Sequence, residues 1–170
     1  MTIKNDNGRE IPEHWQPQAN SRMCFVCGRE NPVGLHMDFY DDLEAGQVKA
    51  PFVIPAPYQG YPGVTHGGVL ASILDEVSGR AINVGREETA FWVTAKLEVR
   101  YRAPTPTETP LTAVGWVVEE RQRSAKVAGE IRLPDGTVTA DAQAIVVNPP
   151  PEMIAEWEEE REFWRVEGEK

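Results

Sequence analysis

Apolar and polar residues alternate most clearly between Phe91 and Arg102, where every second side chain from Phe91 to Tyr101 is apolar. A period of two predicts a β-strand with one buried face, and we expect a long central strand here. Three more strand-like segments follow, with turn residues between them: Leu111 to Glu119, Ser124 to Leu133 and Val138 to Val147. The four segments together predict an antiparallel meander.

A second pair of strands is expected upstream. Residues Leu35 to Tyr40 alternate, a polar turn occupies 41–46, and another apolar run extends from Val48 to Val53. Pro51 lies inside that run and has no N–H to donate, so it should shorten the strand or place it at a sheet edge.

Between these strands and the meander, apolar residues recur with the spacing of a helix. The stripe consists of Leu70, Ile73, Leu74, Val77 and Ala81. It predicts a helix with one buried face, with Thr65 as N-cap, running to about Asn83 and ending at Gly85 in the left-handed conformation. Because this is the only long apolar helix in the sequence, the chain predicts an α+β fold, an antiparallel sheet wrapped around one central helix.

The segments on either side of this core differ from it in composition. Residues 1–34 are polar and rich in turns and predict an extended lead-in with a Cys-x-x-Cys turn, whereas residues 35–148 form the predicted domain. Residues 149–170 begin with three prolines and predict an extra, acidic C-terminal helix that carries Trp157 and Trp164 on one side. Two tryptophans on such a helix indicate docking on the body of the protein or on a partner.

The 170 residues carry a formal net charge of -10, with a pI near 4.8. This acidity argues against nucleic acid or an anionic membrane surface as a partner. No run of about eighteen apolar residues occurs, and the first residues lack the apolar core of a signal peptide. We therefore expect a cytoplasmic protein without a membrane segment.

Cys24 and Cys27 are the two cysteines of the chain, and a single Cys-x-x-Cys supplies half of a zinc site. His14 and His36 are not spaced as a ligand pair, so no metal and no cofactor is predicted. A structural turn with reduced thiols is the favoured interpretation, and a metal site or a redox dithiol is the alternative.

The residues with the strongest chemical signal stand at the predicted helix start. His66 is followed by Gly67 and Gly68, and a helix N-terminus presents unpaired N–H groups and the positive end of the helix dipole. Without side chains, the glycines let a carbonyl oxygen approach those N–H groups, as in an oxyanion hole. Asp75 lies two turns further along among small residues, which favours a functional carboxylate over a surface one.

Four segments carry a resemblance to a known family. They are the Gly-Val-Thr-His-Gly-Gly motif at 63–68 with Asp75 nine positions after its histidine, the strand segment 93–104, the hairpin segment 135–142, and the Cys-x-x-Cys-Gly segment with Asn-Pro-Val-Gly-Leu at 24–35. In this combination, residues 22–148 resemble the hot-dog-fold acyl-CoA thioesterases of the phenylacetic-acid-degradation type, in the 4-hydroxybenzoyl-CoA thioesterase superfamily. The resemblance implies hydrolysis of an acyl-CoA, or a related acyl thioester, to the free acid and CoA.

The family pattern also implies a role for each matching residue. The N–H of Gly67 or Gly68 would bind the oxyanion. Asp75 would act as general base or as nucleophile, and His66 would orient the loop and the thioester. Thr94 stands at the position of a water-orienting hydroxyl and would complete the site from the neighbouring subunit.

Two positions depart from the family pattern. Relatives often carry asparagine where this chain has Gly60, and the adjacent Gln59 is the candidate substitute. Strand parity places Thr94 on the polar face with Lys96, so its approach to Asp75 requires a subunit interface or a local bulge.

A coenzyme A ligand needs local positive charge on so acidic a protein. The candidate phosphate-binding residues are Arg100, Arg102, Arg121 and Arg123. The alternative is that these residues serve only solubility on an exposed strand face. Because the strand from Phe91 to Arg102 would otherwise be a long exposed edge, we expect two copies to pair along it as a homodimer, or in a homotetramer.

Two other functions remain open at this point. A hot-dog enoyl-CoA hydratase or dehydratase would use a histidine and an acid as a proton-transfer pair, whereas the tie between His66 and a Gly-Gly helix start favours acyl transfer. The other is a non-catalytic acyl-CoA-binding module, because the asparagine expected at Gly60 is missing.

Overall fold

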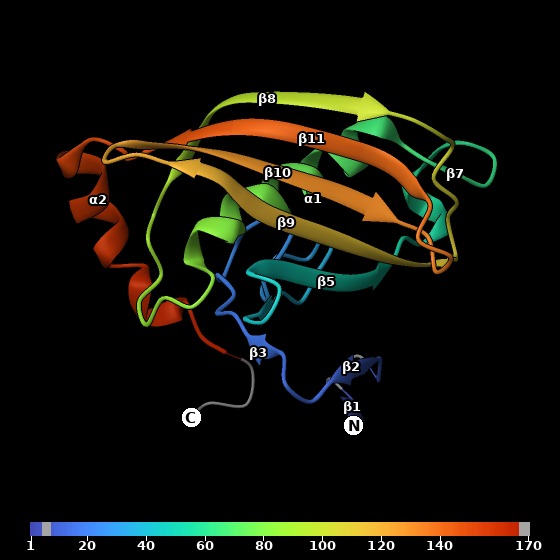
Figure 1. Ribbon diagram of the computed structural model, residues 1–170, viewed down its shortest axis with the longest axis horizontal. Helices are drawn as coiled ribbons and strands as arrows, with labels where there is room; N and C mark the ends of the chain where they lie inside the picture. The colour runs from blue at the N-terminus through green and yellow to red at the C-terminus, as the bar shows by residue number, and fades with distance from the viewer. Residues whose placement is uncertain (5–7, 167–170) are drawn as a thin grey trace.

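The computed structural model describes residues 1–4 and 8–166. One antiparallel sheet of seven strands packs with one face on a single long helix, α1 (Gly67–Arg80) (Figure 1). A short helix, α2 (Pro151–Glu158), follows the last strand. The predicted α+β arrangement, a sheet wrapped around one central helix with an extra C-terminal helix, is confirmed.

The position of β8 in the sheet differs from the prediction. The order of strands is β3 (Gln16–Pro17), β4 (Tyr40–Asp42), β5 (Gln47–Val53), β9 (Pro110–Glu120), β10 (Ser124–Arg132), β11 (Val138–Val147) and β8 (Val93–Tyr101). Within the described part of the chain, β8 pairs with β11 alone, so the segment expected at the centre is an edge strand. The reason is topological: β11 returns between β10 and β8, and no described strand follows it to cover the far side of β8.

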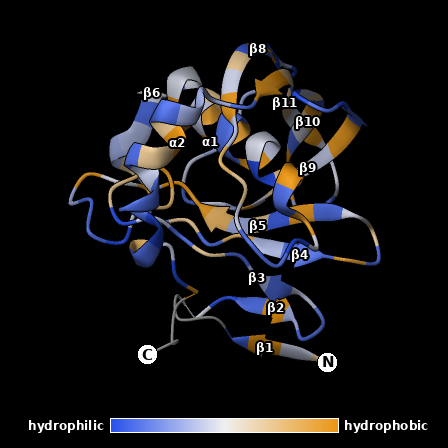
Figure 2. Cartoon of the chain, turned by 90° about the vertical axis from the view of Figure 1, so that its left-hand side faces the viewer, coloured by the Kyte–Doolittle hydropathy of each residue, from blue (hydrophilic) through white to orange (hydrophobic). Residues whose placement is uncertain are grey.

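The buried face of α1 is the predicted apolar stripe. Leu70, Ile73, Leu74 and Val77 are each at most 3% exposed, and burial of each such side chain contributes roughly 1.5–3 kcal/mol. Apolar and polar residues also alternate along the strands (Figure 2). The helix comes so close to β9 that a Cβ at Gly115 would stand 2.2 Å from the backbone oxygen of Val77. A side chain there would push helix and sheet apart.

Both ends of α1 differ from the prediction in detail. His66, not Thr65, is the N-cap, because its Nδ1 accepts a helical N–H while Thr65 belongs to the short strand β7 (Val64–Thr65). The α-helix ends at Arg80 and continues as a 3₁₀ turn over Ala81–Asn83. Gly85 has a φ of +70°, which confirms its predicted left-handed conformation.

The first predicted strand is only partly formed. Of the segment from Leu35 to Tyr40, only the last residue belongs to β4. The N–H groups of Leu35 and Met37 donate to the carbonyls of Phe25 and Val26 at 2.8 and 2.9 Å. This stretch therefore runs beside the lead-in and forms its backbone hydrogen bonds with the lead-in instead of with β5.

Pro51 does not shorten β5, which keeps seven residues between β4 and β9. Pairing with β4 stops at Lys49, two residues before the proline. The Pro51 carbonyl accepts a hydrogen bond from the Arg9 guanidinium at 3.1 Å. Its backbone polar atoms thus point away from β9, and the missing N–H interrupts no bond to that strand.

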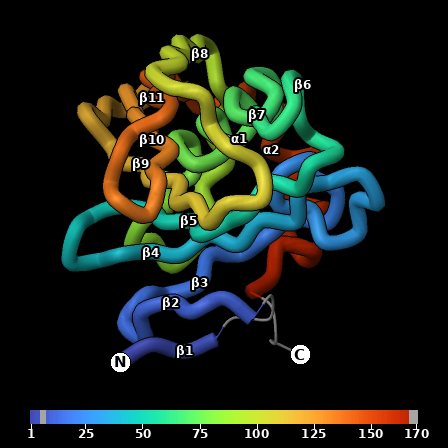
Figure 3. Tube along the Cα trace, turned by 90° about the vertical axis from the view of Figure 1, so that its right-hand side faces the viewer, coloured from blue at the N-terminus to red at the C-terminus, as the bar shows by residue number. Residues whose placement is uncertain are grey.

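Two small hairpins complete the described strands. β1 (Thr2–Lys4) pairs with β2 (Glu10–Pro12) apart from the main sheet, and β6 (Gln59–Tyr61) pairs with β7 immediately before α1 (Figure 3). No helix among the described residues is long and apolar enough to cross a membrane.

The C-terminal segment folds as two short helical pieces rather than one long helix. After α2, a 3₁₀ turn covers Arg161–Phe163, and residues 167–170 of the predicted segment lie outside the described residues. Phe91 meets the rings of Trp157 and Trp164 edge-on, with centroid distances of 6.1 and 5.4 Å. The segment therefore docks on the body of the protein, on the loop before β8.

Candidate active site

The start of α1 leaves one backbone donor free. His66 Nδ1 accepts the Gly68 N–H at 2.9 Å, so that amide is already used by the N-cap. The Gly67 N–H has no hydrogen-bond partner among the described residues. Of the two amides that the sequence offers as oxyanion donors, Gly67 is the one that can receive a ligand oxygen.

Tyr101 fixes this helix start, a role that the sequence did not indicate. Its hydroxyl donates to the Gly67 carbonyl at 2.8 Å, and its ring lies 3.2 Å from the place where a Gly67 Cβ would stand. Tyr101 ends the alternating pattern of β8, and period two predicts only that it faces inward. The contact arises because the end of β8 crosses the N-terminus of α1.

Asp75 and Thr94 meet within one chain. Thr94 Oγ1 donates to Asp75 Oδ1 at 2.8 Å. The register between β8 and β11 shifts at Ala95, since Lys96 is opposite Ile145 and Thr94 is opposite Val146.

This shift is the local bulge that strand parity required. Val146 is 1% exposed and faces the core, so its partner Thr94 faces inward as well. One extra residue at Ala95 thus turns Thr94 from the polar face toward α1. No second subunit is needed for this contact, contrary to the role implied by the resemblance.

The surroundings of Asp75 raise the pKa of its carboxyl group. Its partial burial raises its pKa above the ordinary value for an aspartate, the Thr94 hydrogen bond lowers it, and the neighbouring Glu76 carboxylate raises it again, with a net upward shift. A carboxylate whose pKa is raised by desolvation binds a proton more readily than a surface aspartate, which suits general base catalysis.

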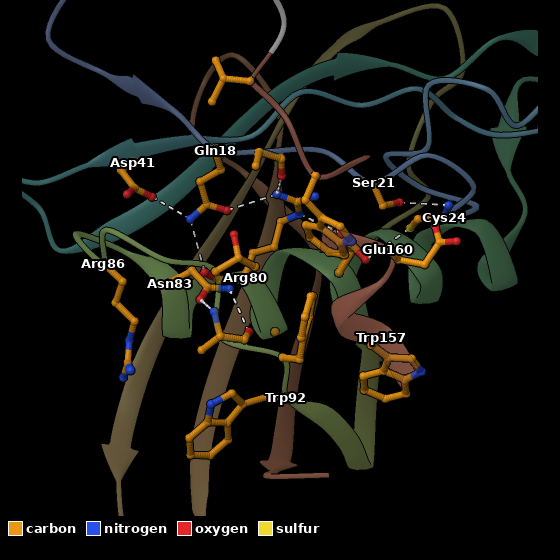
Figure 4. A pocket seen from close by; sticks show the side chains of 18 of the residues that line it. Gln18, Ser21, Cys24, Asp41, Arg80, Asn83, Arg86, Trp92, Trp157 and Glu160 are labelled. Atoms are coloured by element: carbon orange, nitrogen blue, oxygen red, sulfur yellow. Dashed lines mark hydrogen bonds and ion pairs between the residues drawn. The ribbon is translucent and has the colours of Figure 1, made fainter. Parts of the chain in front are cut away.

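A cavity of about 780 Å³ opens beside this pair. Asp75 and Thr94 line it together with four large aromatic side chains, Phe91, Trp92, Trp157 and Trp164. Figure 4 shows Trp92 and Trp157 contributing to it from different elements, the loop before β8 and α2. The cavity therefore places the Asp75 carboxylate near a group of aromatic side chains that the C-terminal segment helps to build, within a lining that is otherwise largely polar.

Gly67 and Asp75 do not lie close together in one chain. Asp75 stands eight positions after Gly67 on α1, which corresponds to a rise of about 12 Å along the helix axis. An attacking oxygen and an oxyanion are bonded to the same carbon, and each lies about 3 Å from the group that serves it. One chain alone does not bring both groups to one carbonyl.

Gln59 and Gly60 belong to strand β6, in the β6–β7 hairpin beside the N-cap. Gln59 Oε1 accepts the N–H of Gly63 at 3.0 Å, so its carbonyl is engaged within the turn. A Cβ at Gly60 would stand 3.3 Å from the Cα of His66. An asparagine at this position would press on His66, which is consistent with the departure of this chain from the family pattern.

The four candidate arginines form two separate groups. Arg100 pairs with Glu98 at 3.4 Å and Arg102 pairs with Asp141, both at the end of β8 near Gly67. Arg121 pairs with Glu119 at 2.8 Å, and with Arg123 it belongs to the β9–β10 turn. Through the strand register that turn lies level with Val93, about 20 Å from Arg100. Within one chain they do not form a single phosphate site.

Comparisons with known proteins agree with this geometry. The model of the thioesterase superfamily matches residues 62–140, which include the His-Gly-Gly helix start, Asp75 and Thr94. Over these residues the chain is similar to the thioesterase superfamily. The sheet of this chain around one helix is the hot-dog fold, as the sequence predicted.

Solved structures extend the likeness. A crystallised thioesterase superfamily protein is 36% identical, with a TM-score of 0.66 over 74% of this chain and 63% of the other. This chain thus spans less than two thirds of that relative. A phenylacetic acid degradation-related protein from Ralstonia eutropha is 25% identical, with a TM-score of 0.55 over 62% of this chain and 79% of the other.

A further neighbour is a hypothetical thioesterase from Streptococcus pneumoniae, solved with coenzyme A. It is 22% identical, with a TM-score of 0.54 over 60% of this chain and 77% of the other, and shows the same fold. No curated protein shows significant similarity to the chain.

Proposed function

We propose that this protein hydrolyses an acyl-CoA, or a related acyl thioester, to the free acid and the thiol. The observation that carries the proposal is the Asp75 carboxylate, which has a raised pKa, accepts the Thr94 hydroxyl and lines a cavity that also contains four aromatic side chains. In the general-base form, Asp75 takes a proton from a water whose oxygen attacks the carbonyl carbon. The C–S bond then breaks, and the proton passes to the departing thiolate.

The nucleophilic form differs in its first step. Asp75 itself attacks the carbonyl carbon, the thiolate leaves, and water then hydrolyses the acyl–aspartyl anhydride. A single turnover in H₂¹⁸O tests for the nucleophilic form. Label in the Asp75 carboxylate identifies it, because water that attacks the aspartyl carbon of the anhydride leaves its oxygen there, whereas general-base catalysis places the water oxygen only in the product acid.

The spacing on α1 supports a site shared by two copies. Since Gly67 and Asp75 are about 12 Å apart on one helix, an oxyanion donor must reach Asp75 from elsewhere. The free edge of β8 offers the means: two copies pairing along it in antiparallel fashion would run their α1 helices in opposite directions. Gly67 of one copy would then approach Asp75 of the other.

Mixed dimers test this arrangement. Asp75→Asn removes the carboxylate, and Gly67→Pro removes the N–H at a first helical position where proline fits the backbone, with a circular-dichroism spectrum to check that the Tyr101 ring, 3.2 Å from the added Cβ, accommodates it. Each variant alone should be inactive, whereas a refolded equimolar mixture should regain roughly a quarter of the wild-type rate, because half of the dimers then hold one intact site of two. An inactive mixture that forms mixed dimers would contradict a shared site.

The parts of the substrate follow from this arrangement. The acyl group would enter the cavity beside Asp75, whose aromatic walls suit an apolar acyl chain or ring. Arg100 and Arg102 flank the tyrosine that contacts Gly67, so they are the favoured partners of the CoA phosphates. The coenzyme A in the Streptococcus pneumoniae structure supports this choice of thiol.

A panel of acyl-CoAs tests the function directly, with release of free thiol as the readout. Turnover by the wild-type protein and its loss in Asp75→Ala are expected. Equal rates in both proteins would contradict the proposal. Hydration of an enoyl-CoA without thiol release would favour the hydratase alternative, and tight binding without turnover would favour the binding module.

A further inference from the structure

The turn that contains both cysteines has the hydrogen bonding of a metal-binding loop. The N–H groups of Val26 and Cys27 point at Cys24 Sγ, at 3.3 and 3.5 Å, and the Gly28 N–H donates to the Cys24 carbonyl at 2.8 Å. Two backbone N–H groups aimed at one sulfur stabilise negative charge on it.

Gly28 is required for this turn to close. A Cβ at that position would stand 2.4 Å from the Cys24 carbonyl oxygen, a backbone atom that cannot move away without opening the turn. Ser21 secures the other side: its Oγ accepts the Cys24 N–H at 3.0 Å and lies 3.6 Å from Cys27 Sγ. Both sulfur atoms are therefore held in place by the backbone around them.

A carboxylate from α1 completes the group. Glu76 Oε2 lies 3.6 Å from Cys24 Sγ, and one ligand atom from each of Cys24, Cys27 and Glu76 lies within 4.8 Å of the other two. Two tetrahedral zinc ligands, a sulfur about 2.3 Å and an oxygen about 2.1 Å from the metal, stand roughly 3.6 Å apart. The observed distance between Glu76 Oε2 and Cys24 Sγ is that of two ligands sharing one ion.

Arg80 orients the carboxylate. Its Nε donates to Glu76 Oε1 at 2.7 Å, which leaves Oε2 directed at the sulfur of Cys24. Arg80 is only 6% exposed and is itself held by the Gln18 side chain and the Ala19 carbonyl. Partners that fix the orientation of a ligand in this way are typical of metal sites.

We propose that Cys24, Cys27 and Glu76 bind a zinc ion. Two thiolates, one carboxylate, the Arg80 guanidinium and a divalent cation sum to a formal charge of zero, so the ion would neutralise a partly buried anionic group. Thiolates favour zinc over magnesium or calcium, and the cavity that Cys24 and Glu76 also line gives access for a water as fourth ligand. This proposal does not depend on the proposed thioesterase activity.

The site uses a ligand that spacing along the chain does not suggest. Of the histidines considered as completing ligands, His36 bonds through Nε2 to the Asn31 carbonyl at 2.5 Å. Glu76 lies 52 residues after Cys24 and reaches it because the lead-in packs against α1. The two cysteines therefore need only Glu76, from the helix, and a water molecule to complete a four-ligand site.

Metal binding is tested on the full chain, purified with a reductant and stripped with a chelator. Titration with Co²⁺ should give thiolate charge-transfer absorption and the strong visible bands of a tetrahedral ion, saturating at one equivalent per chain. Zn²⁺ should displace Co²⁺ and raise the melting temperature of the wild-type protein. No spectral change, or binding without a fixed stoichiometry, would overturn the proposal.

Variants identify the ligands. Cys24→Ser and Cys27→Ser should each weaken Zn²⁺ binding by at least 100-fold, and Glu76→Gln by 10- to 100-fold, measured by competition with a chromophoric chelator. Glu160→Gln is the matched control, since it removes another carboxylate that lines the same cavity, and should leave the affinity unchanged. Unaltered affinity in Glu76→Gln would overturn the assignment of the third ligand.

A redox dithiol is the alternative interpretation of the same two cysteines. Alkylation of the protein as isolated without reductant distinguishes it: two blocked thiols that become reactive after chelation support the metal, whereas blocked thiols that react only after reduction indicate a disulfide and overturn it. These measurements need no variant and hold even if a substituted chain fails to fold.

Discussion

Asp75 and Glu76 are adjacent carboxylates on α1, yet the groups that surround them on the two sides of the helix differ. Successive helical residues point about 100° apart, so Asp75 faces β8 while Glu76 faces the lead-in. Among the described residues no cation pairs with Asp75, which has one hydroxyl as partner. Glu76 has a buried guanidinium at 2.7 Å. The carboxylate left without a counter-charge is the one suited to move a proton, and its neighbour serves structure and ligand binding.

The largest expected difference between the two is in catalysis. Asp75→Asn should lower kcat/KM for a hydrolysed acyl-CoA by roughly 10³-fold, because the amide neither takes a proton from water nor attacks a carbonyl. Steady-state thiol release measures the effect. Glu44→Gln, which removes an exposed carboxylate from the turn after β4, should leave the rate unchanged. A loss below tenfold in Asp75→Asn would remove Asp75 from the mechanism.

The second difference is in stability, where the loss is expected for the Glu76 variant and not for the Asp75 variant. Glu76→Gln should cost about 2 kcal/mol of unfolding free energy, since Arg80 loses its anion but keeps its bonds to Gln18 and Ala19. Urea denaturation of the metal-free protein measures it. Glu158→Gln, which breaks the exposed pair with Arg161, serves as comparison and should lie close to the wild type. Equal stability of both variants would show that the Glu76–Arg80 pair does not hold the lead-in.

A smaller effect concerns the pH dependence of the rate. The Thr94 hydroxyl donates to ionised Asp75 and lowers its pKa, so Thr94→Val should move the acid limb of the kcat/KM profile to higher pH and reduce the plateau about tenfold. Thr94→Ser keeps a hydroxyl and should restore the wild-type profile. An acid limb that stays in place in Thr94→Val would mean that another group controls it.

The smallest effect is a gain in stability. Because the pKa of Asp75 is higher in the folded than in the unfolded chain, its ionisation weakens the fold as the pH rises through the folded pKa. Asp75→Asn should therefore melt a few degrees higher than wild type at neutral pH, and the gain should vanish in acid, where Asp75 is protonated in both states. A gain that persists at low pH would point to packing instead of charge.

Much of the fold follows from local patterns. The four meander strands and the buried stripe of α1 lie where period two and period 3.6 predict them, because each needs only one apolar face. The order of the strands does not follow in this way. An edge strand and a central strand with one buried face have the same alternation, so the edge position of β8 depends on long-range pairing.

The same limit applies to the candidate site. The helix start and Asp75 can be identified from the sequence because glycines and an acid among small residues are unusual in an apolar helix. The N-cap bond of His66, which leaves Gly67 as the free donor, needs the side-chain geometry. The contact between Glu76 and Cys24 joins segments 52 residues apart, and no local sequence pattern predicts it.

The extra residue at Ala95 makes chain length itself a determinant of chemistry. A residue inserted between Ile145 and Val146 would give Ala95 a partner and let β8 pair with β11 without a break, and every residue from Thr94 toward the start of the strand would then turn over. The fold would be kept while a polar hydroxyl and its neighbours exchanged inner and outer faces. Members of a family with this sheet can thus gain or lose a water-positioning group through a single codon insertion or deletion, with no change in any residue that touches substrate.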